Sequence, residues 1–498
     1  MSTLRRFAPA RRVAALATVL GLATVLGLAA GGAGWPAAAQ DAPTIGVPPP
    51  PNPALVPAPA ESTPREYDGS IEDVQRKIGP PALEGSQACV GSGTGGEPRV
   101  EDRPWGQLRL RYPELWQFAP RQGEGQRIAV IDTGVNPHPR LRGRLQDGGD
   151  FVLNATGLHD CDGHGTLVAG IIAADENPDT GFAGIAPRAT ILSIRQSSEL
   201  LKTRYVSERR ETAGQQFGLP SGDTTTMARA IRHAVDVLRA RVINISEAAC
   251  LTAARGNLPQ AGAGHALDLQ AAVRYATDHD VVVVVAAGNV DQDCPQNETG
   301  INAVASPAWF DDDVLAVAAM QENGEPAREF TLAGPWVDVG APGTEITSLD
   351  PATGGLANQT IENGQRGFIQ GTSFATPYVA GLAALIRERF PDLTAREVMY
   401  RIERTAQRPG GKGGRNDLAG YGMINPVAAL TAVIPEEFGA APPQPAPGRL
   451  ENLLPPVRKD PLPTRVALIG SGAGLGLLGI TMFVVYTVQR SRRQPAAP

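Results

Sequence analysis

The chain has 498 residues, a net charge of −6 and a pI near 5.7, which argues against a nucleic-acid-binding protein, because such proteins need basic patches. Hydrophobic residues make up 42% of the chain, enough for a sizeable core, and the length suits about three average domains or one large α/β domain with accessory segments. The 44 prolines gather toward the two ends, which indicates linkers around a folded middle.

The first 39 residues have the order of an export signal. Arginines at positions 5, 6, 11 and 12 precede an apolar run over residues 13–30, and small residues Ala37–Ala39 follow. This pattern predicts a signal peptide over residues 1–39 with cleavage after Ala39. Because the apolar run is long for a signal, an uncleaved anchor is the alternative.

Residues 40–104 are predicted to form an N-terminal extension. Proline and alanine dominate as far as about residue 65, which is typical of an extended linker or an exposed strap. The remainder, to residue 104, is mixed in composition, and we expect it to pack on the surface of the domain that follows.

Residues 105–435 alternate strand-like apolar runs with helical runs. The predicted strands are 127–132, 189–194, 242–246 and 281–287, and the predicted helices are 115–118, 165–173, 227–239 and 267–279. This alternation is typical of an α/β fold with a mostly parallel sheet covered by helices on both faces. The polar stretch 196–226 interrupts it and is predicted to be a long surface loop.

The C-terminal residues have the composition of a tethered tail. Residues 436–465 form a predicted Pro-rich linker, and residues 466–488 contain 23 residues without a charge. At ~1.5 Å rise per residue such a helix crosses a hydrocarbon core of roughly 30 Å. The arginines of residues 489–498 predict that this tail is cytoplasmic and that the folded part lies outside the cell membrane, held by a single span.

Four cysteines are present: Cys89, Cys161, Cys250 and Cys294. Because an exported chain folds in an oxidising compartment, we expect two disulfides. Composition and spacing leave all three pairings open.

Ser373 lies in Gly371-Thr372-Ser373, directly before an apolar run that predicts a buried helix. A hydroxyl at that point lies at the positive end of the helix dipole, among backbone N–H groups without helical partners. Taken alone, the motif equally suits an ordinary serine N-cap.

His164 lies between two glycines at the start of another apolar helix, after Asp162. The alternative is a metal site, since His159, Asp160, Asp162 and His164 are close in sequence, but no zinc-ligand spacing appears and we expect no metal. Asp132 ends a predicted buried strand, where an aspartate is often only a turn former.

These side chains together fit one mechanism. Ser373 attacks a carbonyl, His164 moves the proton, and Asp132 orients the imidazole. Asn289 follows the strand 281–287, where its amide can donate a hydrogen bond to an oxyanion beside the N–H of Ser373. A lipase or esterase would use Gly-x-Ser-x-Gly and the chain order Ser, Asp, His, and this chain has neither.

The motifs around Asp132, His164, Asn289 and Ser373 resemble those of the subtilisin-like serine proteases over about residues 105–435. The signal peptide, the cysteine-bearing extension and the Pro-rich linker before a single span are similar to the mycosins, membrane-anchored subtilases of type VII secretion systems. The resemblance implies a doubly wound α/β sheet and a serine endopeptidase without a cofactor, acting on a protein or peptide substrate. It also implies a type VII secretion membrane complex as partner. In such a complex the chain could alternatively be a structural subunit whose proteolysis is dispensable.

The resemblance further implies a disulfide pattern. In the subtilisin-like sheet, Cys250 and Cys294 follow two neighbouring strands, so the expected pairs are Cys250–Cys294 and Cys89–Cys161. The second pair would hold the extension beside His164, and we expect the extension to stay attached. One departure concerns residues 246–248, which read Ser-Glu-Ala where subtilases usually have Ser-Leu-Gly beside the substrate. This departure leaves the primary-pocket preference open.

Overall fold

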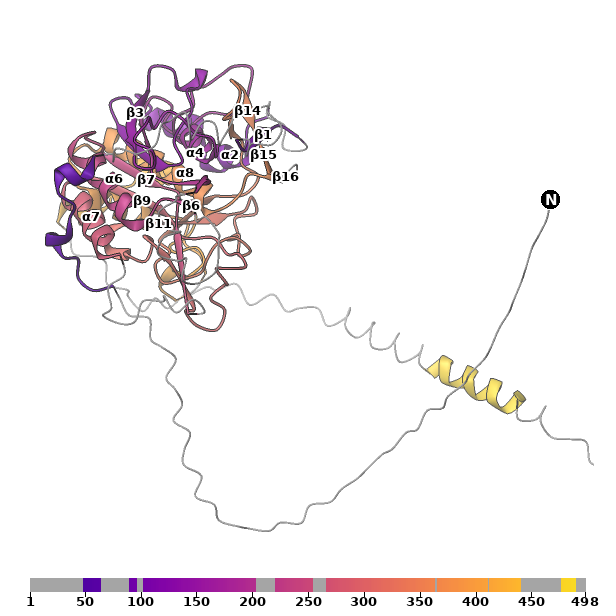
Figure 1. Ribbon diagram of the computed structural model, residues 1–498. Helices are drawn as coiled ribbons and strands as arrows, with labels where there is room; N and C mark the ends of the chain where they lie inside the picture. Colours follow the sequence, from indigo (N-terminus) through magenta and orange to yellow (C-terminus); the bar gives the residue numbers. More distant parts are fainter. Residues whose placement is uncertain are drawn as a thin grey trace, which may run out of the picture. The chain divides into compact units, whose positions relative to one another are not determined.

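The computed structural model describes residues 48–63, 89–95, 102–202, 220–253, 266–362, 365–410, 412–439 and 476–489 (Figure 1). The chain divides into two units, residues 1–432 and 433–498. The predicted signal peptide, most of the predicted linker 436–465 and the tail beyond residue 489 lie outside the described residues.

A seven-stranded sheet forms the centre of the first unit. Its strand order is β12-β11-β9-β7-β2-β4-β3, and every pair of neighbours is parallel. The strands are β2 (Arg127–Asp132), β3 (Leu145–Asp150), β4 (Thr190–Arg195), β7 (Val242–Ile245), β9 (Val282–Ala286), β11 (Leu315–Met320) and β12 (Val339–Pro342). The predicted α/β fold with a parallel sheet is confirmed.

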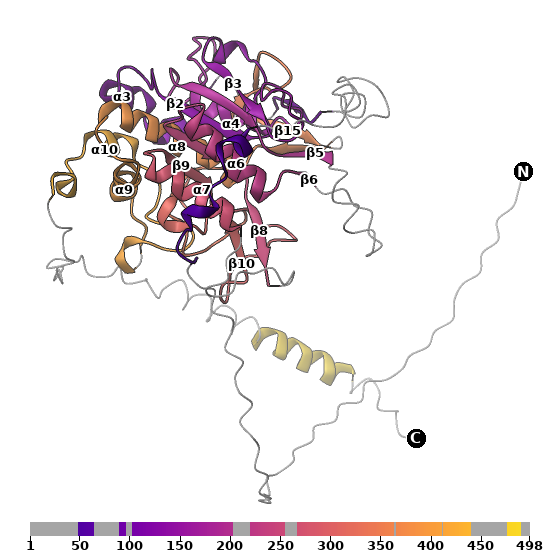
Figure 2. The same ribbon diagram turned by 60° about the vertical axis from the view of Figure 1, so that its left-hand side comes forward.

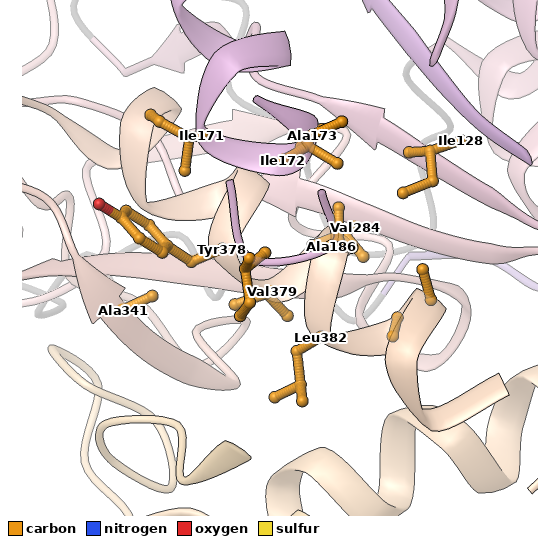
Figure 3. Close-up of a cluster of buried hydrophobic side chains, with 14 of the residues drawn as sticks. Ile128, Ile171, Ile172, Ala173, Ala186, Val284, Ala341, Tyr378, Val379 and Leu382 are labelled. Carbon is orange, nitrogen blue, oxygen red and sulfur yellow. The ribbon is translucent and has the colours of Figure 1, made fainter. Parts of the chain in front are cut away.

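Alternate residues of each strand enter two separate cores, because successive side chains of a strand point to opposite faces. Ile128 and Val130 of β2 pack with α4 (His164–Ala173) and α8 (Thr372–Arg389), and Figure 3 shows Ile128 and Val284 in this core beside side chains of both helices. Ala129 and Ile131 instead pack with α6 (Thr224–Asp236) and α7 (Leu267–Asp278). The inner strands β2, β9 and β11 are mostly apolar, because helices cover both faces of the sheet, whereas the edge strand β3 carries exposed polar residues such as Gln146 and Asp147.

Shorter elements complete the first unit. Helices α9 and α10 contact each other and α8, and α10 also contacts α3 (Figure 2). The helices are α2 (Trp105–Leu110), α3 (Tyr112–Phe118), α9 (Ala395–Thr405) and α10 (Pro426–Thr431). The antiparallel pairs are β8 (Ala249–Thr252) with β10 (Ala303–Ser306), β13 (Ser348–Leu349) with β14 (Leu356–Ala357), and β15 (Gln359–Glu362) with β16 (Gln365–Phe368).

The predicted surface loop 196–226 is wrong at both of its ends. Residues Ser198–Lys202 form β5, which pairs antiparallel with β6 (Pro220–Ser221). Helix α6 also begins earlier than predicted, at Thr224, because Asp223 caps it: the carboxylate accepts a 2.7 Å hydrogen bond from Thr226 N. The polar composition of this stretch concealed a short antiparallel strand pair and a helix cap.

Parts of the N-terminal extension lie against the first unit. The 3₁₀ turn η1 (Pro53–Leu55) contacts α7, and η2 (Pro59–Ser62) contacts α6, as the indigo segment in Figure 1 shows. Gln270 Nε2 of α7 donates a 2.6 Å hydrogen bond to Pro49 O. Further along, β1 (Gly91–Gly93) pairs antiparallel with β15. These contacts form a strap along one helical face and a strand at one edge.

In the second unit, residues 435–438 form the 3₁₀ turn η7 and residues 476–489 form a helix with exposed apolar side chains. Residues 466–475 of the predicted span lie outside the described residues. Among the helices that the structure describes, none has both the length and the apolar character needed to cross a membrane.

Candidate active site

The candidate site lies at one edge of the sheet. Asp132 is the last residue of β2, and Asn289 follows β9, with β7 between these two strands. Because parallel strands end at the same edge of a sheet, these side chains lie close together. Helices α4 and α8 both begin at this edge, with His164 as the first residue of α4 and Ser373 as the second residue of α8.

Asp132 and His164 are joined by a hydrogen bond of 2.8 Å between Oδ1 and Nδ1. Asp132 is fully buried, and the same oxygen accepts a 2.8 Å hydrogen bond from Thr133 N. The His164 ring also lies beside the Phe374 ring, with centroids 5.0 Å apart. Burial lowers the pKa of His164, but the charge of Asp132, its hydrogen bond and the nearby Glu247 outweigh burial and raise that pKa above 6.5.

Ser373 and His164 line the same cavity, which has a volume of about 1010 Å³. Both residues belong to the described part of the chain, and the structure records no hydrogen bond between Ser373 Oγ and the imidazole. Such catalytic hydrogen bonds are often long without substrate. Gly371 has φ of 138°, a left-handed conformation that favours glycine, and it turns the chain into α8 directly before Ser373.

Pro377 explains how the backbone of Ser373 is held. Proline has no N–H, so the carbonyl four residues earlier, that of Ser373, receives no helical hydrogen bond. Ser246, directly after β7, donates a 2.7 Å hydrogen bond from Oγ to this carbonyl, and Asn244 Nδ2 donates to Ser246 Oγ at 2.9 Å. The central strand therefore fixes the start of α8.

Asn289 is held by its carbonyl oxygen. Its Oδ1 accepts hydrogen bonds from Thr372 N at 3.0 Å and Thr372 Oγ1 at 2.8 Å. A Cβ built on Gly371 would lie 3.4 Å from Asn289 Nδ2 and 3.5 Å from Ser373 Oγ. The amide donor and the hydroxyl thus border the same small space, where a substrate carbonyl could lie.

Comparison with known proteins agrees with this geometry. The model of the Subtilase family matches residues 123–422. The chain belongs to the subtilase family. Over 459 residues it is 40% identical to Mycosin-3 of Mycobacterium tuberculosis (strain ATCC 25618 / H37Rv), which covers 87% of this chain and 94% of the relative. Mycosin-4 of the same strain is 42% identical over 394 residues, covering 77% of this chain and 80% of the relative.

Solved structures show the same likeness. The MycP3 protease from the type VII (ESX-3) secretion system aligns with a TM-score of 0.62 and 38% identity, covering 77% of this chain and 99% of that chain. A chain of an intact ESX-5 inner membrane complex aligns with a TM-score of 0.66 and 34% identity, covering 88% of this chain and 99% of that one. The predicted resemblance to subtilases, and among them to mycosins, is confirmed.

Asp160, which the sequence suggested only as a member of an alternative metal site, supports the residues around Asp132 and His164. Its buried carboxylate accepts hydrogen bonds from Thr133 Oγ1, Gly163 N and both the N–H and the hydroxyl of Thr166, at 2.6–2.8 Å. Asp160 therefore ties the first turn of α4, which carries His164, to the residue after Asp132. Burial raises its pKa to about 6, although these donors act in the opposite direction. In the sequence, the only sign of this role was that Asp160 lies four residues before His164.

Glu247 is a further acidic residue of the subtilase site. Its Oε1 lies 3.9 Å from His164 Nδ1, and 35% of its side chain is exposed. Burial raises the pKa of Glu247, as does the negative charge of Asp132, to about 7. Sequence reasoning flagged residues 246–248 as unusual but did not place this carboxylate beside the imidazole.

Among the described residues, Asp132, His164 and Glu247 could also hold a metal ion, because one ligand atom of each lies within 4.8 Å of the others. This set differs from the sequence-based alternative of His159, Asp160, Asp162 and His164. A metal on His164 Nδ1 would replace the proton that bonds to Asp132, so the metal and proton-transfer roles of this imidazole exclude each other.

Two disulfides border the same cavity of the subtilase. They join Cys89 to Cys161 and Cys250 to Cys294, the two pairs that the family resemblance implies. Val90 N also donates a 2.9 Å hydrogen bond to Cys161 O, and Cys89 and Val90 line the cavity. The N-terminal extension thus contributes to the wall of the candidate active site.

Proposed function

We propose that the chain is a serine endopeptidase that hydrolyses peptide bonds through an acyl-enzyme. The observation that carries this proposal is the 2.8 Å hydrogen bond between buried Asp132 and His164, at the edge of a cavity that Ser373 also lines. Membership of the subtilase family supports it. The assignment of Asp132, His164 and Ser373 as the catalytic residues, and of Asn289 to the oxyanion hole, is part of the proposal.

In this mechanism Ser373 Oγ attacks the peptide carbonyl carbon while His164 Nε2 accepts the hydroxyl proton. Asp132 keeps the Nδ1–H of His164 directed toward itself and stabilises the imidazolium. Asn289 Nδ2 and the backbone N–H of Ser373 donate to the oxyanion. The C–N bond then breaks as His164 returns the proton to the leaving amine. Water, activated by His164, hydrolyses the ester and restores Ser373.

We also propose that the protein belongs to a type VII secretion membrane complex and that residues 466–488 anchor it in the bacterial membrane. Support comes from the likeness to a chain of an intact ESX-5 inner membrane complex and to a chain of its periplasmic assembly. The uncharged run and the arginines that follow it support a single span with an extracytoplasmic protease domain. Removal of residues 466–498 should release the protein from sedimented membranes, and retention would contradict the anchor.

A fluorophosphonate probe tests the protease proposal, because it reacts with an activated serine. We expect the wild type to be labelled and Ser373→Ala to be unlabelled. His164→Ala should react far more slowly, because Ser373 then lacks its base. Thr405→Val removes a hydroxyl of α9 that donates to a helix carbonyl and serves as the matched control. Equal labelling of the wild type and Ser373→Ala would contradict the proposal.

Secretion separates the enzymatic role from the alternative role of a structural subunit. A structural subunit must assemble into the complex but need not cleave peptides. If the chain has only this role, cells with a chromosomal Ser373→Ala variant that still sediments with membranes should secrete proteins normally. Lost export with an intact complex would instead show that proteolysis is required. A deletion of the whole chain provides the reference for the loss of both roles.

A further inference from the structure

The acidic residue beside the proposed catalytic base faces the substrate cavity. Glu247 follows β7 at the carboxyl edge of the sheet, lies 3.9 Å from His164 Nδ1 and lines the same cavity as Ser373. About a third of its side chain remains exposed, so a substrate can reach it. In the usual subtilase pattern a leucine takes this place, so the carboxylate changes the chemistry of the cleft.

The cavity as a whole is acidic. The described residues that line it include Asp162, Glu199, Glu247 and Asp291, and none of its described lining residues is lysine or arginine. Because these four carboxylates outnumber the one imidazole, that of His164, in the described lining, the cavity attracts cations and disfavours anionic ligands.

Two of these carboxylates already have backbone and hydroxyl donors. Asp162 accepts hydrogen bonds from Ser198 Oγ at 2.6 Å and Glu199 N at 2.8 Å, and Asp291 accepts one from Cys294 N at 2.7 Å. These hydrogen bonds hold the backbone around residues 198–199 and 291–294 in place, so the Asp162 and Asp291 carboxylates already have structural partners. Within the described part of the chain, neither Glu199 nor Glu247 forms an ion pair with a lysine or arginine.

Glu199 and Glu247 also act on each other. The charges of Asp132 and Glu199 raise the pKa of Glu247, as burial does, whereas the charge of His164 lowers it, so negative charge outweighs positive charge around this carboxylate. A guanidinium or ammonium group that enters the cavity would be attracted by both carboxylates, because both residues line it. Charge-assisted hydrogen bonds to such a group are stronger than neutral ones.

We propose that Glu247, together with Glu199, is a specificity-determining pair that binds a lysine or arginine side chain of the substrate within the few residues that flank the scissile bond. The inference rests on the proposed peptidase function and adds the substrate class: cationic polypeptide segments. A segment with aspartate or glutamate at the same position is disfavoured, because its charge would face at least two carboxylates.

Peptides that differ only in charge test this proposal. Quenched fluorescent peptides carry arginine at one position at a time around the scissile bond, and each is matched with a peptide that has citrulline there, which is isosteric but neutral. We expect kcat/KM to be about ten-fold higher for arginine than for citrulline at one position, which corresponds to ~1.4 kcal/mol. Assays contain EDTA so that no divalent cation occupies the site.

Glu247→Gln should bring the arginine-to-citrulline ratio to within about two-fold of unity, and Glu199→Gln should lower it by a smaller factor. Glu176→Gln is the matched control, because this exposed glutamate follows the far end of ten-residue α4, about 15 Å from His164 along the helix axis. Its ratio should equal that of the wild type. A wild-type ratio near unity at every position, or an unchanged ratio in Glu247→Gln, would overturn the proposal.

Binding to Ser373→Ala extends the test to a chain that does not cleave the peptides. Fluorescence anisotropy with the same arginine and citrulline peptides should give the same preference in Kd, and adding Glu247→Gln should remove it. Cleavage or binding without charge preference contradicts the substrate class alone. Absence of both cleavage and fluorophosphonate labelling contradicts the peptidase function. In that case the binding of arginine and citrulline peptides to Ser373→Ala still decides whether Glu247 recognises a cation.

Discussion

Ser246 Oγ donates a 2.7 Å hydrogen bond to the backbone carbonyl of Ser373, which Pro377 leaves without a helical partner. This bond joins the end of the central strand β7 to the start of the helix that carries the proposed nucleophile. A residue that makes no contact with the reacting atoms thereby sets the position of Ser373.

Ser246→Ala should therefore weaken both stability and catalysis. The substitution leaves the Ser373 carbonyl and Asn244 Nδ2 without their partner, which costs about 1–3 kcal/mol for buried polar groups. We expect this loss in urea unfolding, together with a several-fold lower kcat. Thr431→Val is the control, since its exposed hydroxyl donates to Val427 O at 2.7 Å and its loss should change stability little. Unchanged stability and kcat in Ser246→Ala would show that the bond is dispensable.

Asn289→Asp separates the two functions of the amide. Aspartate can still accept the hydrogen bonds of Thr372, but it offers no N–H to an oxyanion. Loss of one such donor typically lowers kcat by about 10²–10³-fold. Steady-state kinetics should show this loss mainly in kcat, with KM changed far less. A change confined to KM would indicate that Asn289 binds the ground state and does not stabilise the oxyanion.

The rate of peptide cleavage should depend on the protonation of His164. The imidazole must be neutral to accept a proton from Ser373, so kcat/KM rises with pH through the His164 pKa. Asp132, Glu247 and Asp160 all raise that pKa against the effect of burial, so the acid limb should lie above pH 6.5. A profile of kcat/KM with an uncharged peptide locates the limb, and a midpoint below 6.5 would contradict this expectation.

Glu247→Gln should move the acid limb to lower pH. Removing a negative charge 3.9 Å from Nδ1 destabilises the imidazolium and lowers the His164 pKa. Because burial raises the pKa of Glu247 to about 7, its charge acts mainly above that pH. Glu176→Gln should leave the profile unchanged. A limb that stays in place or moves to higher pH in Glu247→Gln would exclude an electrostatic action of Glu247 on His164.

The Cys89–Cys161 disulfide should stabilise the protein and hold the extension in the mature chain. It links residues 72 positions apart, so replacing both cysteines with serine should cost about 2–4 kcal/mol of unfolding free energy. The same replacement at Cys250 and Cys294, 44 positions apart, should cost slightly less in the loop-entropy account. Urea unfolding compares the two. Non-reducing peptide mapping of the mature protein should recover a peptide that contains Cys89 linked to Cys161. Absence of that peptide would contradict retention of the extension.

The sequence alone determined the α/β class and the candidate residues, because both depend on local patterns. Buried parallel strands read as continuous apolar runs, so β2 and β9 were visible from their valines and isoleucines. Asp132, His164 and Ser373 each lie in a glycine-containing motif at a strand end or helix start. The predicted loop at residues 196–226 was wrong at its two ends because a short pair of polar strands carries no comparable signal.

Only the tertiary structure decided how these residues are held. Three contacts show this: Thr133 donates to Asp160, Ser246 donates to the Ser373 carbonyl, and Glu247 lies close to His164. Each joins residues that are far apart in the chain, so no local sequence pattern reveals it. Strand order brings β9, β7 and β2 side by side, and no local pattern encodes that order. The chemistry of the site could be predicted from residue types, whereas its charge balance depends on distances that exist only in the fold.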